Sequence, residues 1–328
     1  MLSTLLLAAI TGASIVYARC ECGYRLQDTD AYYTYLLTSN FTNYTDATAL
    51  NSRSANFSTD WTVQSWSSNA TQSDPFPRTY SESNVFIQDG VLVMRQGAYS
   101  VADREANRSV SIAAIVSKRD DFLHGSFRAV FNVSEDRGSV GGFFWYHDND
   151  NEIDIEVLTK EANDTTIHYT THPSVDSRDN PIPGASTAET LMLPWTELQE
   201  HRFDWSKNSI TFFENSRALH NTTVNIPRVG GSVQMNLWAD GSQWSGTPSL
   251  KNVTMNVQSI QIFYNTTDSE DGTDKGFNSA CNVAGGPSHK TVCKVVDDEV
   301  KSSDARMRML ETASWSWTIT ALLAWMLL

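Results

Sequence analysis

The sequence predicts an all-β protein built as a sandwich of two antiparallel sheets, and three observations support this fold class. Short runs rich in β-branched and aromatic residues recur along the chain, with turn residues between them. Asp89-Gly90 separates two of these runs and is a specific signal for a hairpin turn. No segment between the termini shows a sustained helical period. With 328 residues and 40% hydrophobic content, the chain can bury one full core.

The predicted strands follow one another at a spacing typical of such a sandwich. They cover residues 84–88, 91–95, 113–117, 126–133, 142–147, 153–158, 166–171, 200–205, 210–214, 232–238 and 258–264. Asn208-Ser209 is a weaker turn signal between two of the later strands. Residues 266–280 are polar and contain glycine, so we expect a loop there.

The segment 151–158 is the most informative part of the chain, because Glu152, Asp154 and Glu156 alternate with apolar residues. Successive side chains of a strand point to opposite faces, so the three acids share one face. An ordinary exposed strand shows the same alternation, but it usually mixes charges of both signs. Here no Lys or Arg occurs between positions 137 and 160. Crowded carboxylates raise the pKa of at least one of them, so the segment predicts an acid-lined active site.

The residues just before the acidic strand, 141–147, read GGFFWYH and are densely aromatic. Sugar rings stack their C–H faces on aromatic side chains, while their hydroxyl groups take hydrogen bonds. Aromatic surface beside paired carboxylates therefore favours a carbohydrate ligand.

Taken together, these motifs make the chain resemble glycoside hydrolase family 16, the secreted β-glucanases and glucan transglycosylases built on a concanavalin-like jelly roll. The resemblance covers roughly residues 79–264. Its motifs stand in the family's order and spacing: GGFFWY at 141–146, EIDIE at 152–156, HRFDW at 201–205, ITFF at 210–213 and MNLW at 235–238, followed by Gly241 and Trp244. One departure is Val-Leu-Thr at 157–159, where the family often has Phe-Leu-Gly, and this weakens any inference about the substrate.

The resemblance implies that Glu152 is the nucleophile, Asp154 a supporting carboxylate and Glu156 the general acid and base of a retaining glycosidase. Spacing alone leaves the stereochemistry open. Strand residues four apart have Cα atoms about 13 Å apart, and leaning side chains reach both a retaining separation of about 5–5.5 Å and an inverting one of about 6.5–9.5 Å. A wall-remodelling glucan transglycosylase and a lectin-like binder without catalytic activity are the alternative functions.

The resemblance also implies a substrate cleft across one sheet. By alternation, Phe144 and Tyr146 face this cleft, whereas Phe143 and Trp145 pack inward. The other expected substrate-binding residues are His168, Asn236, Trp238 and Trp244. Large aromatic residues are mostly buried, so a core position is the alternative for Trp238.

We predict neither a cofactor nor a catalytic metal. Residues 148–152 resemble the start of a calcium loop, but Ile153 occupies the position where the sharp turn needs Gly. His168 and His172 are four residues apart, which suits zinc on a helix, yet they lie in a predicted strand and its end. The net charge of −14 argues against nucleic acid as a partner. The expected partner is a β-glucan polysaccharide, bound by a monomer.

The two ends of the chain predict a secreted, surface-attached protein. Residues 1–18 read as a signal peptide, residues 19–293 as a single catalytic domain and residues 294–303 as a short stalk. Residues 304–328 resemble a removable glycosylphosphatidylinositol signal, with a short membrane tail as the alternative. Ten Asn-x-Ser/Thr sequons favour a glycoprotein located outside the cell or at its wall.

Four cysteines form two close pairs near the ends, Cys20 with Cys22 and Cys281 with Cys293. A bridge across a single intervening residue is geometrically awkward. We therefore expect disulfides that join the amino end to the carboxyl end, in either of the two possible pairings.

Overall fold

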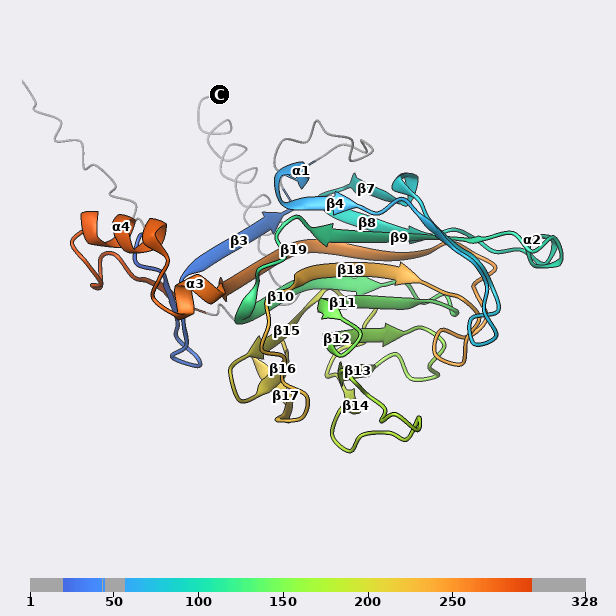
Figure 1. The fold of residues 1–328 in the computed structure, drawn as a ribbon. Helices are drawn as coiled ribbons and strands as arrows, with labels where there is room; N and C mark the ends of the chain where they lie inside the picture. Colours follow the sequence, from blue (N-terminus) through green and yellow to red (C-terminus); the bar gives the residue numbers. More distant parts are fainter. Residues whose placement is uncertain (1–19, 43, 45–56, 297–328) are drawn as a thin grey trace, which may run out of the picture.

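The structure is a computed structural model that describes residues 20–42, 44 and 57–296. Two large sheets, one of nine strands and one of eight, pack against each other, and a small three-stranded sheet joins the two ends of the described chain. Figure 1 shows the long strands of both sheets running side by side, with few helical turns around them. The predicted two-sheet sandwich is confirmed.

The nine-stranded sheet carries the acidic segment near its middle. Its order is β14 (Ser186–Thr190), β13 (Thr166–Thr171), β12 (Asn151–Leu158), β11 (Val140–Asp148), β18 (Ser232–Trp238), β9 (Val110–Ser117), β6 (Arg78–Tyr80) and β5 (Ser67–Ser68), and β4 (Trp61–Val63) also pairs with β9. Its neighbouring strands are antiparallel except for β6 and β9, which run parallel.

The eight-stranded sheet covers the other side of the core. Its order is β17 (Arg217–Thr222), β16 (Ile210–Glu214), β15 (Gln199–Trp205), β10 (Leu123–Val133), β19 (Val253–Asn265), β8 (Val91–Gln96) and β7 (Val85–Gln88), and β3 (Tyr35–Asn40) also pairs with β19. All of these pairs are antiparallel.

The core between the sheets is aromatic. Trp145 of β11 and Trp205 of β15 are fully buried, and their ring centroids lie 4.6 Å apart. Phe127 of β10 stacks on Phe203 of β15 at 4.7 Å. Burying each such side chain contributes about 1.5–3 kcal/mol, and this packing fixes which face of β11 and β12 points outward.

The predicted hairpin at Asp89-Gly90 joins β7 to β8. Both residues have positive φ, 50° and 77°, as a type I′ turn requires. Gln88 pairs directly with Val91, so the loop has two residues and the prediction is confirmed.

The prediction of a loop at residues 266–280 is wrong, because this segment contains the helices α3 (Thr267–Glu270) and α4 (Lys275–Val283). Side chains at their amino ends favour these short helices. Thr266 forms a capping box with Ser269, and Asp274 accepts a hydrogen bond from the backbone N–H of Phe277 at 2.9 Å. Three more short helices are α1 (Phe57–Asp60), α2 (Val101–Glu105) and the 3₁₀ helix η1 (Glu82–Asn84).

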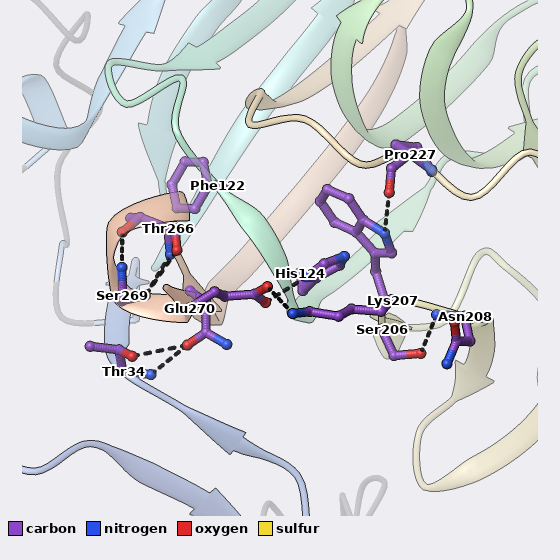
Figure 2. A network of polar contacts seen from close by, with 12 residues as sticks. Thr34, Phe122, His124, Ser206, Lys207, Asn208, Pro227, Thr266, Ser269 and Glu270 are labelled. Atoms are coloured by element: carbon purple, nitrogen blue, oxygen red, sulfur yellow. Dashed lines mark hydrogen bonds and ion pairs between the residues drawn. The ribbon is translucent and has the colours of Figure 1, made fainter. Parts of the chain in front are cut away.

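Ionic contacts fasten α3 to the eight-stranded sheet (Figure 2). Glu270 lies 2.5 Å from Nδ1 of His124 and 3.1 Å from Nζ of Lys207. Burial acts to raise the pKa of the Glu270 carboxyl, but the contacts with His124 and Lys207 outweigh it, so the pKa is below its usual value. The ionised form of Glu270 therefore stabilises this docking.

The ends of the domain are joined in the small sheet formed by β2 (Tyr32–Tyr33), β1 (Tyr24–Leu26) and β20 (Cys293–Val295), in which β1 and β20 run parallel. Disulfides link Cys20 to Cys293 and Cys22 to Cys281. This confirms the expected cross-links between the two ends and selects one of the two pairings.

Part of the expected stalk at 294–303 belongs to the fold, because residues 294 and 295 extend β20 beside β1. The remainder of that stalk beyond residue 296, the signal peptide at 1–18 and the anchor signal at 304–328 lie outside the described residues. Within the described ranges, no helix combines the length and the apolar character that a membrane span requires.

Candidate active site

The acids of β12 line a cavity of about 310 Å³ on the outer face of the nine-stranded sheet. Ile153 and Ile155 are fully buried in the core and fix the orientation of the strand. Glu152, Asp154 and Glu156 consequently point the other way, and all three border the cavity. The structure thus brings the three predicted catalytic carboxylates together at one site.

The neighbouring strand β11 presents its aromatic residues as alternation predicted. Tyr146 is paired with Glu152 and Phe144 with Asp154, and both rings are partly exposed on the acidic face. Phe143 and Trp145, which alternate with them along β11, are fully buried. Phe144 and Tyr146 therefore extend the acidic face sideways, although neither borders the cavity itself.

Gly142 lies between the acidic strand and Asn236, since it pairs with Glu156 on one side and with Asn236 on the other. A Cβ at position 142 would lie only 2.5 Å from Oδ1 of Asn236. This oxygen is buried without a hydrogen-bond partner among the described residues. Asn236 thus packs over the glycine toward the acids, as expected for its strand position.

Trp244, in the loop after β18, reaches the acids directly. Its Nε1 donates a hydrogen bond of 2.9 Å to Oε2 of Glu156. His168, paired with Glu156 in register, meets the indole edge-on at 5.1 Å, and Nζ of Lys160 lies 5.7 Å from the ring centroid. Nε2 of His168 lies 3.3 Å from Glu161. Trp244 is thus braced by two neighbours while 37% of it remains exposed.

Trp238 lies on the same face of the sheet but outside the cavity. It packs against a small second cluster that includes Tyr99, Val110 and Ile112. The guanidinium of Arg78 lies 5.7 Å from its ring centroid. These contacts support the alternative that Trp238 is a packing residue and does not bind the substrate.

Sequence reasoning did not include His172 among the site residues. Its Nε2 lies 3.1 Å from Oδ2 of Asp154 and 3.9 Å from Oε2 of Glu152. Thr170, Ser174 and Ser186 also line the cavity and were not predicted. Alternation along β13 could have indicated Thr170 and His172, because residues 168, 170 and 172 share one face once β13 is paired with β12.

Glu152, Asp154 and His172 each present one donor atom, and these three atoms lie within 4.8 Å of one another. One imidazole and two carboxylates suit a divalent transition metal by donor type. From the sequence we considered residues 148–152 and the pair His168 and His172 as metal ligands and expected no catalytic metal. The folded chain assembles a different donor set.

Burial and mutual repulsion raise the pKa of all three acids. Burial and the charge of Asp154 raise the pKa of Glu152 to about 9, although His172 opposes the shift. Burial and the charge of Glu156 raise the pKa of Asp154 well above its usual value. For Glu156, burial raises the pKa to about 7, while the hydrogen bond from Trp244 acts in the opposite direction.

Glu152 and Asp154 are hydrogen-bonded to each other, so one of the two carboxyls carries the proton of that bond. Either carboxyl can carry this proton and donate it to the other. Beside this pair stands a separate carboxylic acid, Glu156, whose proton is exchangeable near neutral pH because its pKa is raised to about 7.

A row of carboxylates in a cavity on the outer face of a β-sandwich is typical of a glycoside hydrolase. The sequence profile described as "Glycosyl hydrolases family 16" matches residues 72–258. The chain belongs to this family.

Curated relatives agree with this assignment. A beta-glucanase of Brevibacillus brevis is 32% identical over 142 residues, which cover 39% of this chain and 51% of that protein. The endo-1,3-1,4-beta-glycanase ExoK of Rhizobium meliloti is 25% identical over 189 residues, covering 54% of this chain and 64% of its own length. The chain spans about half the length of the Brevibacillus relative and 21% of a xylanase/beta-glucanase of Ruminococcus flavefaciens.

Solved structures share the fold. The Bacillus licheniformis beta-glucanase superposes with a TM-score of 0.54 at 18% identity, covering 70% of this chain and 98% of that one. The endo-beta-1,3-glucanase from Pyrococcus furiosus gives 0.56 at 16% identity, with 75% and 99% coverage. A Crh5 transglycosylase in complex with NAG gives 0.51 at 16% identity, with 71% and 85% coverage. These likenesses confirm the predicted jelly-roll sandwich.

Proposed function

We propose that the protein hydrolyses a β-glucan by a retaining double displacement. The observation that carries this proposal is the row of three carboxylates in one cavity, in which Glu152 and Asp154 are hydrogen-bonded to each other while Glu156 has its own partner, Trp244. Membership of family 16 supports the same chemistry.

In the first step, a carboxylate oxygen of Glu152 attacks the anomeric carbon while Glu156 donates its proton to the departing glycosidic oxygen. The shared proton resides on Asp154 at this moment, so Glu152 is an anion. In the second step, Glu156 removes a proton from water, the water oxygen bonds to the anomeric carbon, and Glu152 leaves as a carboxylate. His172 lies close enough to Asp154 to stabilise the pair as its charge changes.

The names of the relatives point to β-glucan as the substrate class. They include beta-glucanases and an endo-1,3-1,4-beta-glycanase, and the structural neighbours include an endo-beta-1,3-glucanase. A screen of the purified protein against laminarin, lichenan, xyloglucan and chitin oligosaccharides identifies the linkage.

The decisive test is Glu152→Gln, with Glu197→Gln at an exposed position as the matched control. We expect the first variant to lose activity by about a thousandfold or more, as for removal of other enzymatic nucleophiles, and the control to keep it. NMR of the fresh product should show the β anomer first. Unchanged hydrolysis by Glu152→Gln contradicts the assignment, and an α anomer contradicts retention.

Transfer to a sugar acceptor is the second candidate function, and the fold shared with the Crh5 transglycosylase favours it. In that case Glu156 activates an acceptor hydroxyl in place of water. A fluorescent acceptor oligosaccharide separates the two functions, because only transfer extends the labelled product.

We also propose that the protein is a secreted, glycosylated monomer attached to the cell surface by a lipid. The apolar start, the ten sequons and the carboxyl-terminal tail support this location. Among the sequon asparagines that the structure describes, six are exposed: Asn40, Asn69, Asn107, Asn163, Asn221 and Asn252. Release from cells by phosphatidylinositol-specific phospholipase, and a mass decrease on deglycosylation, are the expected results.

A further inference from the structure

The carboxyl-terminal part of the domain has an unusual charge for this chain. Residues 275–296 include three lysines and no carboxylate, although the whole chain has a net charge of −14. One of these lysines, Lys294, lies on β20 in the small terminal sheet. This short basic stretch lies between acidic residues, Asp274 before it and the run Asp-Asp-Glu at 297–299 after it.

The register of the terminal sheet places two cations next to each other. Lys294 of β20 pairs with Arg25 of β1, and Arg25 pairs in turn with Tyr32 of β2. The three side chains therefore form one row across the sheet. Like charges on paired strand positions destabilise a sheet, so this arrangement is unfavourable unless an anion lies against it.

The chain itself neutralises this row only in part. Arg25 forms an ion pair of 3.0 Å with Asp30, whose side chain is highly exposed, and such pairs are weak. Lys294 has no ion pair with any carboxylate in the described part of the chain. Within the residues that the structure describes, the ammonium group of Lys294 is therefore available to a ligand.

The row forms one side of a groove of about 600 Å³, and residues of the loop before β20 form the other. Pro287 and Val292 give the groove apolar surface, and His289 adds a third basic group. Tyr32 is 38% exposed, and its hydroxyl is held by the carbonyl of Cys22 at 2.7 Å. The phenol ring is thus fixed in orientation and contributes aromatic surface to the groove.

Cross-links and hydrogen bonds hold the groove in shape. The backbone N–H of Cys22 donates to the carbonyl of Thr291 at 2.9 Å, and the hydroxyl of Thr291 donates to the carbonyl of Gly286 at 2.7 Å. Both disulfides of the domain end in this region. A site that is ordered before binding loses little entropy on binding.

We propose that this groove binds an acidic saccharide, a sugar ring that carries a carboxylate or phosphate group. The ring lies against Tyr32 and Pro287, and the anionic group lies between Arg25 and Lys294, which matches the chemistry of the groove. The carboxylates of the catalytic cavity repel such a ligand, so it is distinct from the neutral glucan that we propose as substrate.

Calorimetry with the full chain tests this site, with trigalacturonate and mannose 6-phosphate as probes and with inorganic phosphate and laminaritriose as references. We expect saturable binding of at least one acidic sugar, more tightly than phosphate or the neutral sugar. Trigalacturonate binding alone identifies a carboxylate ligand, and mannose 6-phosphate binding alone a phosphate ligand.

Lys294→Glu should weaken binding at least tenfold. Lys290→Glu is the matched control, because this lysine is exposed in the same segment and does not line the groove. Glucan hydrolysis should be unchanged in both variants, which shows that they fold and separates this site from the catalytic one. Equal binding by both variants, equal affinity for inorganic phosphate, or no saturable binding of either acidic sugar overturns the proposal.

Discussion

Replacing Trp244 by Phe removes one hydrogen bond from the proposed general acid while keeping an aromatic ring in place. The indole Nε1 donates to Oε2 of Glu156 at 2.9 Å and stabilises the ionised carboxylate. This bond opposes the burial that raises the pKa of Glu156 to about 7. Without the bond, the protonated form of Glu156 persists to higher pH.

A hydrogen bond to a charged group contributes about 1.5–3 kcal/mol, and about 1.4 kcal/mol corresponds to a tenfold change in a protonation equilibrium. A shift of about one to two pH units follows. Trp244 is 37% exposed, so water replaces part of the lost donation. We therefore expect the lower end of the range, about one pH unit upward.

The assay is the pH dependence of kcat/KM on a soluble β-glucan. A general acid must be protonated when the substrate reacts, so the basic limb of the profile reports the pKa of Glu156. We expect this limb to move upward in Trp244→Phe and to stay fixed in Trp66→Phe, a control at an exposed tryptophan. A profile that falls uniformly at all pH values, with the basic limb in its original place, would refute the reasoning.

Three further predictions concern packing and stability. Gly142→Ala places a Cβ 2.5 Å from Oδ1 of Asn236, so we expect kcat/KM to fall about ten- to a hundredfold with little change in the unfolding midpoint; unaltered kinetics contradict this. Glu270→Gln should lower the free energy of unfolding by about 1.5–3 kcal/mol at pH 7. The folded-state pKa of Glu270 is below 4.5, so its stabilising effect is present above pH 4.5 and is lost as the pH falls through the folded-state pKa. Urea titrations that show the same loss of stability at pH 7 and at pH 3 would contradict this prediction. Cys293→Ser opens the bridge to Cys20 and should cost about 2–5 kcal/mol by thermal unfolding, with glucan hydrolysis retained at low temperature; an unchanged melting temperature argues against this.

The central strands could be predicted from the sequence because each is a run rich in β-branched and aromatic residues between turn residues, and several also show apolar and polar alternation. The predicted ranges 166–171, 210–214 and 232–238 coincide with β13, β16 and β18. The acidic face of β12 followed from the same alternation, since burial of Ile153 and Ile155 dictates where the acids point. Local pattern and tertiary structure agree here, so the prediction needed no knowledge of the neighbouring strands.

Other elements depend on partners that are remote in sequence. Arg25 and Lys294 become neighbours only because β1 pairs with β20, and these strands are more than 250 residues apart in the sequence. Short strands such as β5 and β6 have too few residues to show a period, and the short helices α3 and α4 are recognisable mainly by the capping residues at their amino ends. His172 joins the acids only through the pairing of β13 with β12.

The terminal sheet gives the domain an almost circular backbone. The Cα atoms of Cys20 and Cys293 are 5.2 Å apart, a gap that one or two added residues can bridge. A permuted gene that fuses these positions and opens the chain at an exposed tip, such as the turn between β11 and β12, would lose residues 294–295 of β20 but would retain the strand neighbours of both large sheets. Fusion partners could then be moved from the basic groove to the rim of the catalytic cavity.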